Sequence, residues 1–254
     1  MTGAPENLTQ DRFLGGGLIL LQPAKGYRAG IDPVLLAASI PAESGQSILE
    51  LGCGVGTALL CLGHRVPGLE LTGVELQPSY ADCARRNAER NAIAAKIVTA
   101  DLSKLPLAVR QVRHHHVLAN PPYFLRDSGP PSLVTAREIA LGEQTPLELW
   151  VKIAAKRLLP GGFATFIQRA DRLDQLLAAM ADHLGSFQIL PFAPRGGRDC
   201  HLVLVRGRKG GRAALRLHAP KFLHVSASHS RDGEDYSPEI SDILRAGHPL
   251  NFPK

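Results

Sequence analysis

Few cysteines and no long apolar run distinguish this 254-residue sequence at first sight. Its four cysteines, Cys53, Cys61, Cys83 and Cys200, form no C-x-x-C pair and have no histidines at a matching spacing. This pattern argues against a zinc or disulfide framework and fits a reducing compartment. No apolar run reaches the length of a membrane span, and the residues up to Arg12 are too polar for a secretory signal. We therefore expect a cytoplasmic protein with no metal and no membrane partner.

Acidic residues are scarce in one stretch near the C-terminus. Between Arg195 and His224, Asp199 is the single acid against eight lysines or arginines, so this stretch carries +7 while the whole chain carries +6. Most charge runs are solvated surface, but this concentration favours a polyanionic partner, most simply RNA. The residues expected to contact nucleic acid are Arg195, Arg198, Arg206, Arg208, Lys209 and Arg212.

Strand-like apolar runs alternate with amphipathic stretches through most of the chain. Strands are predicted over 47–51, 70–75, 96–100, up to 119, and over 163–167, 187–192 and 201–205, with helices over 34–40, 57–66, 78–91, 146–159, 171–184 and 238–245. This alternation predicts an α/β fold with a doubly wound, seven-stranded, mostly parallel sheet. The last two strands have no helix between them, which predicts that they are antiparallel neighbours at one edge, with an antiparallel edge strand. Pro160-Gly161-Gly162 is expected to end the helix over 146–159, before the fifth strand.

A glycine-rich turn follows the first of these strands. Gly52, Gly54 and Gly56 have the spacing G-x-G-x-G and are followed by Thr57. A dinucleotide site would have G-x-G-x-x-G, and a P-loop would have a lysine after its last glycine. Glu50 lies two residues before the first glycine, where it would repel a phosphate. The turn therefore indicates a ligand that carries an ammonium group.

The next two strands also end in acids. Glu75 lies nineteen residues after Gly56, where a carboxylate can accept hydrogen bonds from both hydroxyls of a ribose. Asp101 ends the third strand, where it can accept from an adenine amine while Leu102 packs against the ring. Each acid alone would more often be a helix cap or a solvated loop residue. Three acids at three strand ends favour a common ligand, because ligands of open α/β sheets bind at those ends.

These runs resemble the motifs of the class I S-adenosylmethionine-dependent methyltransferases. ELGCGVGT resembles their first motif, VELQP their second and TADL their third. The resemblance implies a Rossmann-like methyltransferase fold with S-adenosyl-L-methionine as cofactor, the glycines lining it, Glu75 on its ribose and Asp101 on its adenine. The cofactor-binding residues expected on this basis are Tyr27, Arg28, Gly30, Asp32, Glu50, Gly52, Gly54, Gly56, Thr57, Glu75, Leu76, Asp101, Leu102 and Asn120.

Asn120-Pro121-Pro122-Tyr123 follows the fourth strand and is the candidate catalytic motif. The prolines fix the backbone, so that a carbonyl and the Asn120 side-chain oxygen present two acceptors. Two acceptors suit an amine with two hydrogens, and Tyr123 offers a face on which a planar base can stack. By itself, Asn-Pro-Pro is also a common turn. The motif resembles that of methyltransferases acting on adenine, on guanine N2 or on a glutamine amide.

The N-terminal sequence resembles the bacterial tRNA(Val) adenine-N6 methyltransferase family. The similar residues are Asp11-Arg12-Phe13-Leu14-Gly15-Gly16, Gln22-Pro23, Gly26-Tyr27-Arg28-Ala29-Gly30-Ile31-Asp32 and Leu35-Leu36-Ala37-Ala38. This resemblance implies an adenine next to the anticodon as substrate, and a segment from Tyr27 to Asp32 that closes over the methionine end of the cofactor. Asp32 is also a natural helix N-cap before Pro33. Gly17 and the run His114-His115-His116 depart from the family, and we expect the histidines to be a solvated or edge-strand stretch without a metal.

Three alternatives remain open. A protein glutamine-N5 methyltransferase would normally have a helical N-terminal domain, and about 45 residues precede the glycine turn here. An rRNA guanine-N2 methyltransferase often carries a second domain. A non-catalytic RNA-binding module would be expected to lose Asp101 or the Asn-Pro-Pro-Tyr motif. We expect three parts: a segment at 1–44 that caps the cofactor site, a methyltransferase core at 45–206, and a basic segment with a polar tail at 207–254.

Overall fold

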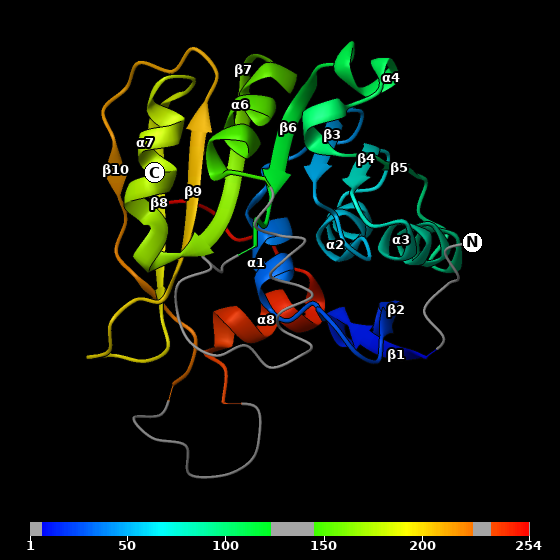
Figure 1. The fold of residues 1–254 in the computed structure, drawn as a ribbon. Coiled ribbons are helices and arrows are strands. Elements are labelled where there is room, and N and C mark those ends of the chain that lie inside the picture. Colours follow the sequence, from blue (N-terminus) through cyan, green and yellow to red (C-terminus); the bar gives the residue numbers. More distant parts are fainter. Residues whose placement is uncertain (1–6, 123–144, 226–234, 254) are drawn as a thin grey trace, which may run out of the picture.

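A twisted, mostly parallel sheet forms the centre of the computed structural model, which describes residues 7–122, 145–225 and 235–253 (Figure 1). Its seven long strands are β3 (Ser47–Leu51), β4 (Glu70–Glu75), β5 (Ala95–Thr99), β6 (His114–Ala119), β7 (Leu158–Arg169), β8 (Gly185–Ala193) and β9 (Leu202–Arg208). They are ordered β8-β9-β7-β6-β3-β4-β5, and β9 is antiparallel to both of its neighbours. Two short strands, β10 (Arg216–Leu217) and β11 (Lys221–Phe222), pair with β8.

Helices cover both faces of the sheet, because alternate strand residues supply two separate hydrophobic clusters. Ile48 of β3 belongs to one cluster and Leu49 to the other, as the two-residue period of a strand requires. The first cluster receives side chains from α1 (Asp32–Ser39), α2 (Thr57–Arg65), α3 (Pro78–Arg90) and α8 (Pro238–Ala246). The second receives them from α4 (Leu107–Arg110), α6 (Leu147–Arg157) and α7 (Leu173–Ala181). No helix in the described ranges has the length and apolar character needed to cross a bilayer.

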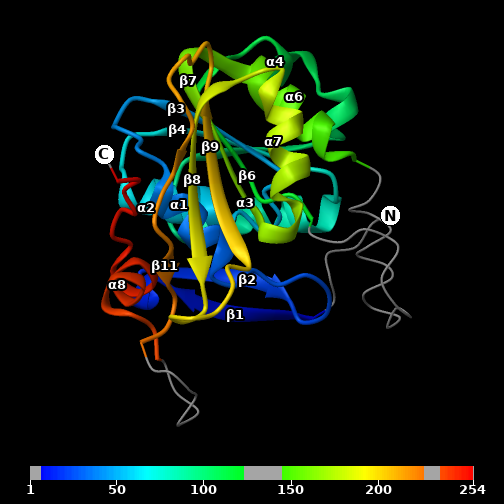
Figure 2. The same cartoon turned by 90° about the vertical axis from the view of Figure 1, so that its left-hand side faces the viewer.

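The predicted doubly wound fold is confirmed, with a difference in the position of the antiparallel strand. β9, expected at the edge, lies between β7 and β8. Its first six residues are buried, whereas the first four of β8 are half-exposed. An apolar run with both faces covered suits an inner strand, and a more polar strand suits a position nearer the edge. In Figure 2, β8 and β9 run side by side in opposite directions.

The helix predicted over 146–159 ends at Arg157, three residues before the Pro160-Gly161-Gly162 run that was expected to stop it. β7 is continuous from Leu158, directly after α6, and contains Pro160-Gly161-Gly162. Leu158 pairs with His114 and Phe163 pairs with His116, so the residues between them bulge out of the ladder. The glycine-proline run therefore forms a bulge near the start of β7, directly after the end of the helix.

The three histidines were wrongly expected on a solvated or edge strand. They belong to β6, which lies between β3 and β7, and His114 and His116 are buried. Burial lowers the pKa of each of these two to about 4, helped by the charges of Arg157 beside His114 and Arg206 beside His116. Both are therefore neutral near pH 7. Among the described residues there is no cluster of three or more His, Cys, Asp or Glu that could hold a metal ion.

The helix predicted over 238–245 is found as α8, but both terminal regions also show features that the sequence patterns did not predict. β1 (Leu8–Phe13) and β2 (Leu18–Pro23) form an antiparallel hairpin joined by the short 3-10 turn η1 (Leu14–Gly16). The C-terminal stretch was expected to be a polar tail, but Ile240, Ile243, Leu250 and Phe252 are buried in the first cluster. Asp32 is the first residue of α1 rather than its N-cap, a shift of one position.

Candidate active site

The glycine turn and the Asn-Pro-Pro motif leave the sheet from neighbouring strand ends. Leu51, the last residue of β3, pairs with Ala119, the last residue of β6. The connections reverse direction between these two strands, since β4 and β5 continue on one side and β7 on the other. Such a switch point is where ligands of open α/β sheets bind. The structure therefore places the predicted cofactor turn and the predicted acceptor motif at one site.

The glycines of the turn adopt backbone conformations that other residues rarely adopt. Gly52, Gly54 and Gly56 have φ values of 64°, 55° and 87°. A Cβ on Gly52 would overlap the ring of Trp150, whereas a Cβ on Gly54 would meet nothing within 4 Å. The turn thus packs tightly against α6 on one side and leaves open space beside Gly54. That open side is where a ligand could approach the backbone.

Two buried carboxylates hold the turn to its neighbours. Glu75 accepts from Gly54 N at 2.9 Å and from Gln77 N at 2.8 Å, and Glu50 accepts from Leu59 N at 2.9 Å. Burial raises the pKa of both, and the backbone hydrogen bonds oppose this rise. Each carboxylate has lone pairs left for a ligand. Glu75 could therefore accept ribose hydroxyls while it fixes the position of Gly54.

Asp101 follows β5 and is the N-cap of the 3-10 turn η2 (Leu102–Lys104), where it accepts from Ser103 N at 2.7 Å. This hydrogen bond lowers the pKa of Asp101, so the carboxylate is ionised at neutral pH. Leu102 is buried, while Leu76 after β4 is 37% exposed. The capping role does not exclude a ligand contact, because a carboxylate has a second oxygen.

Two further features fit the expected cofactor. The Thr57 hydroxyl oxygen, at the start of α2, is buried without a hydrogen-bond partner among the described residues. Buried polar groups are nearly always paired, so an unpaired hydroxyl beside the glycine turn indicates a missing partner. A Cβ on Gly30 would also meet nothing within 4 Å, so its backbone is open to a ligand. Carboxylate, hydroxyl and open glycine backbone together match the donors and acceptors of S-adenosylmethionine.

Within the described residues, the acceptor motif forms hydrogen bonds with side chains from two other segments. Asn120 is half-buried, and its Nδ2 donates to the Tyr27 hydroxyl at 3.4 Å. Arg172, the last residue of the 3-10 turn η3 (Ala170–Arg172), donates through an NH1 group to the Pro122 carbonyl at 3.1 Å. Pro121 is buried. Tyr123, the expected stacking residue, lies outside the described residues.

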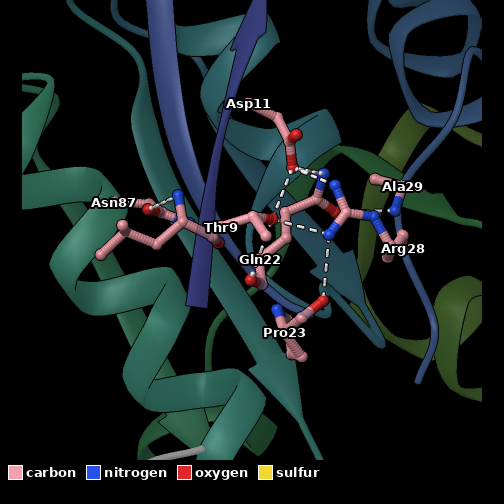
Figure 3. A network of polar contacts seen from close by, with 8 residues as sticks. Thr9, Asp11, Gln22, Pro23, Arg28, Ala29 and Asn87 are labelled. Atoms are coloured by element: carbon pink, nitrogen blue, oxygen red, sulfur yellow. Dashed lines mark hydrogen bonds and ion pairs between the residues drawn. The ribbon is translucent and has the colours of Figure 1, made fainter. Parts of the chain in front are cut away.

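A polar network holds the segment that carries Tyr27 and Gly30 (Figure 3). Arg28 was expected to bind the cofactor, but its NH1 group donates to the Thr9 hydroxyl at 2.6 Å and the Pro23 carbonyl at 3.2 Å. Its NH2 group forms an ion pair with Asp11 at 2.7 Å. Gln22 completes the network, donating to Asp11 and accepting from Ala29 N, each at 2.8 Å. Because both terminal nitrogens are engaged, Arg28 anchors the segment to the hairpin.

Asn87 on α3 is a site residue that the sequence reasoning missed. It accepts from Leu21 N at 2.7 Å and donates to Leu21 O at 3.0 Å and Val55 O at 2.9 Å. A fully buried amide with three partners ties the hairpin to the glycine turn. The only possible sequence signal was an asparagine on the apolar face of a predicted helix.

The residues expected to bind nucleic acid separate into three groups. Arg206 was wrongly included, because it is buried, donates to Ser39 O and lies 4.0 Å from the centre of the Phe252 ring. Arg195 is ion-paired with Asp235, and Arg198 is exposed in the loop after β8, at the acceptor edge. The others, Arg208, Lys209 and Arg212, lie at the opposite edge of the sheet, because β9 runs antiparallel.

Comparison with known proteins identifies the family. Residues 48–133 match the model of a methyltransferase domain. A tRNA1(Val) (adenine(37)-N6)-methyltransferase of Porphyromonas gingivalis is 34% identical over 241 residues, which cover 91% of this chain and 92% of that protein. A protein of the same name from Yersinia enterocolitica is 30% identical over 49% of this chain and 53% of its own length.

Solved structures share the fold. A predicted O-methyltransferase from Agrobacterium tumefaciens is 26% identical, with a TM-score of 0.70 over 88% of this chain and all of that one. The Thermus thermophilus 16S rRNA N2 G1207 methyltransferase, solved with AdoMet and guanosine, has a TM-score of 0.55 at 20% identity, over 80% of this chain and 50% of that one, and shows the fold alone. The chain is an S-adenosylmethionine-dependent methyltransferase and belongs to the bacterial tRNA1(Val) (adenine(37)-N6)-methyltransferase family.

Proposed function

We propose that this enzyme methylates the exocyclic N6 of an adenine in tRNA, at or near the anticodon. The placement of Asn120 beside the glycine turn, through the pairing of Leu51 with Ala119, carries the reaction type. The Porphyromonas gingivalis relative is similar over nearly the whole length of both chains, and its name supports adenine as the methylated base and tRNA as the substrate. A base in a loop is already partly unpaired, so moving it into a site costs less than opening a duplex.

The acceptors of the motif explain how a poor nucleophile could react. The lone pair of an adenine amine is delocalised into the ring. If Asn120 Oδ1 and the Pro121 carbonyl accept its two hydrogens, the nitrogen favours a pyramidal geometry. Its lone pair is then no longer delocalised and can attack the methyl group. The Pro122 carbonyl is already engaged by Arg172, which supports Pro121 as the second acceptor. S-adenosylmethionine supplies a methyl group already activated on a positive sulfur, so the nitrogen needs no strong base.

The substrate is tested by comparing nucleosides from cells with and without the enzyme. Mass spectrometry of digested tRNA is expected to show N6-methyladenosine that disappears when the enzyme is removed. Loss of N2-methylguanosine instead would move the acceptor to guanine, and loss of a methylated glutamine would move it to protein. Restoration of the modification by purified enzyme and radiolabelled cofactor on unmodified tRNA controls for indirect effects.

Removing the Glu75 side chain is expected to weaken cofactor binding. Glu75→Ala leaves ribose hydroxyls without an acceptor and frees Gly54 N, which should cost about 1–3 kcal/mol of binding free energy. Titration calorimetry with S-adenosylhomocysteine measures the change. Burial raises the pKa of Glu75, so wild-type affinity should begin to fall at a higher pH on acidification than for an exposed glutamate. Equal affinity of variant and wild type would remove Glu75 from the site.

We also propose a place where RNA phosphates bind. Arg110, Arg113, Arg157 and Lys209 lie together at the edge of the sheet opposite Asn120, and we call them the far-edge cluster. Burial, and after it the neighbouring cations, lower the pKa of Arg157 and of Lys209. None of the four forms an ion pair within the described part of the chain. The six residues of β6 separate the two edges by about 17 Å, roughly five base-pair steps.

Neutralising part of this cluster should flatten the salt dependence of RNA binding. Arg110→Gln with Arg113→Gln removes two exposed cations, and the slope of log K against log salt should fall by about 1.4–1.8. Fluorescence anisotropy with labelled tRNA measures it. The matched control, Arg86→Gln with Lys96→Gln, removes the same charge from exposed positions elsewhere. Identical slopes for the two double variants would contradict a specific contact.

A further inference from the structure

We propose that Tyr27 is a positioning residue for the acceptor site, whose hydroxyl holds the Asn120 amide in the orientation that the reaction requires. The inference rests on the proposed function, because it gives Asn120 the role of accepting from the substrate amine. Family resemblance placed Tyr27 over the cofactor; the geometry points to a second task.

The geometry that carries this inference is a contact between the N-terminal segment and the acceptor motif. Tyr27 lies 93 positions before Asn120 in the sequence, yet its hydroxyl accepts from Asn120 Nδ2 at 3.4 Å. Tyr27 is 48% exposed, so its ring contributes little to the core.

The orientation of the amide decides whether Asn120 can serve the amine. An asparagine side chain has a donor NH2 group and an acceptor oxygen of nearly the same shape. If the two were exchanged, the NH2 group of Asn120 would face the NH2 group of the substrate, and no hydrogen bond would form. With Nδ2 donating to Tyr27, Oδ1 is left to accept from the substrate. Arg172 holds the neighbouring Pro122 carbonyl from the other side, so the motif is fixed at two points. Fixing acceptors before the substrate arrives is how sites reduce the cost of reaching the transition state.

The hairpin supplies the rigidity that Tyr27 needs. The next residue, Arg28, is bound to Asp11, Thr9 and Pro23 of the hairpin (Figure 3). Tyr80 on α3 donates to the Tyr27 carbonyl at 3.2 Å. The backbone on which Tyr27 sits is therefore held from two sides. The N-terminal segment thereby acts on the acceptor half of the site as well as on the cofactor half.

The test is Tyr27→Phe, which removes the hydroxyl and keeps the ring. We expect kcat to fall on the order of tenfold, while KM for tRNA and the Kd for S-adenosylhomocysteine stay within about twofold. The decisive measurement is the same change in an Asn120→Ala background under single-turnover conditions. If Tyr27 acts through Asn120, its removal there should have almost no effect, because coupled residues are not additive. Tyr236→Phe, a tyrosine stacked on His224 outside the site, is the control and should behave as wild type.

The outcomes separate this inference from the proposed function. An equal fall in kcat from Tyr27→Phe in both backgrounds would overturn it, as would a parallel loss of S-adenosylhomocysteine affinity, which would make Tyr27 a cofactor residue. If wild type methylates guanine or a glutamine amide instead of adenine, the proposed substrate fails, and the same cycle is run on the NH2 group of that substrate. Thermal unfolding of Tyr27→Phe at the wild-type temperature confirms that the variant is folded.

Discussion

Replacing Asn120 with alanine is expected to lower kcat by about 10²–10³-fold, the usual effect of removing one preorganised polar contact to a reacting group. We expect the cofactor to bind against the neighbouring glycine turn, so the Kd for S-adenosylhomocysteine should change by no more than a few-fold. Asn120 is half-buried at the end of β6 and is bonded to the exposed Tyr27, so the fold should tolerate the change. Single-turnover methyl transfer to tRNA and calorimetry measure the two quantities separately.

A parallel loss of turnover and cofactor affinity would contradict this role and make Asn120 a cofactor residue. Asn120→Asp is the informative companion, because a carboxylate keeps the acceptor oxygens and loses the donor to Tyr27. We expect it to retain more activity than Asn120→Ala, since one oxygen can still accept from the substrate amine. Equal activity of the two variants would show that the oxygen does not contribute.

Alanine at Gly52 and at Gly54 should give opposite phenotypes. Both residues have positive φ, so each substitution carries a backbone penalty of about 1–2 kcal/mol. At Gly52 the added methyl group also overlaps the Trp150 ring, and overpacking adds about 1–3 kcal/mol. Gly52→Ala should therefore lower the free energy of unfolding by roughly 2–5 kcal/mol. Gly54→Ala should lower it by the backbone penalty alone.

Cofactor affinity should fall more in Gly54→Ala than in Gly52→Ala, the reverse of the order expected for stability. The methyl group of Gly54→Ala points into the open space beside the turn, where it would meet a bound cofactor. Its affinity for S-adenosylhomocysteine should fall on the order of a hundredfold, about 3 kcal/mol. Urea unfolding and calorimetry on each variant provide the comparison. Wild-type affinity in Gly54→Ala would place the cofactor elsewhere.

Local patterns in the sequence were sufficient for the core strands and for the glycine turn. Ser47–Leu51 and Glu70–Glu75 were predicted to the residue, because a parallel strand is a short apolar run bounded by turn residues. The meeting of Gly52 and Asn120 also followed, since parallel strands present their carboxyl ends at one edge. Whether Glu75 and Asp101 contact the cofactor stays a prediction.

Pairings between distant segments were not predictable from those patterns. In the sequence, Arg206 is indistinguishable from the other cations of the basic stretch. Only the order of the strands shows that its side chain is buried against Phe252. The hairpin β1–β2 lacks the alternation that marks a half-exposed strand, because five of the six residues of β2 are buried. Asn87 and Arg28 depend on partners that the folded chain brings to them.

The buried contact of Arg206 has a consequence for synthesis on the ribosome. It joins Ser39, Arg206 and Phe252, so one cation needs a carbonyl from the first fifth of the chain and a ring from its last residues. Until Phe252 has left the exit tunnel, its ring cannot pack on the Arg206 guanidinium, and α8 cannot bury the apolar side chains of the first cluster. Chains elongate at about 5–20 residues per second, so the incomplete protein exposes this apolar surface for some seconds. The nascent enzyme should therefore depend on holding chaperones until Phe252 has left the exit tunnel.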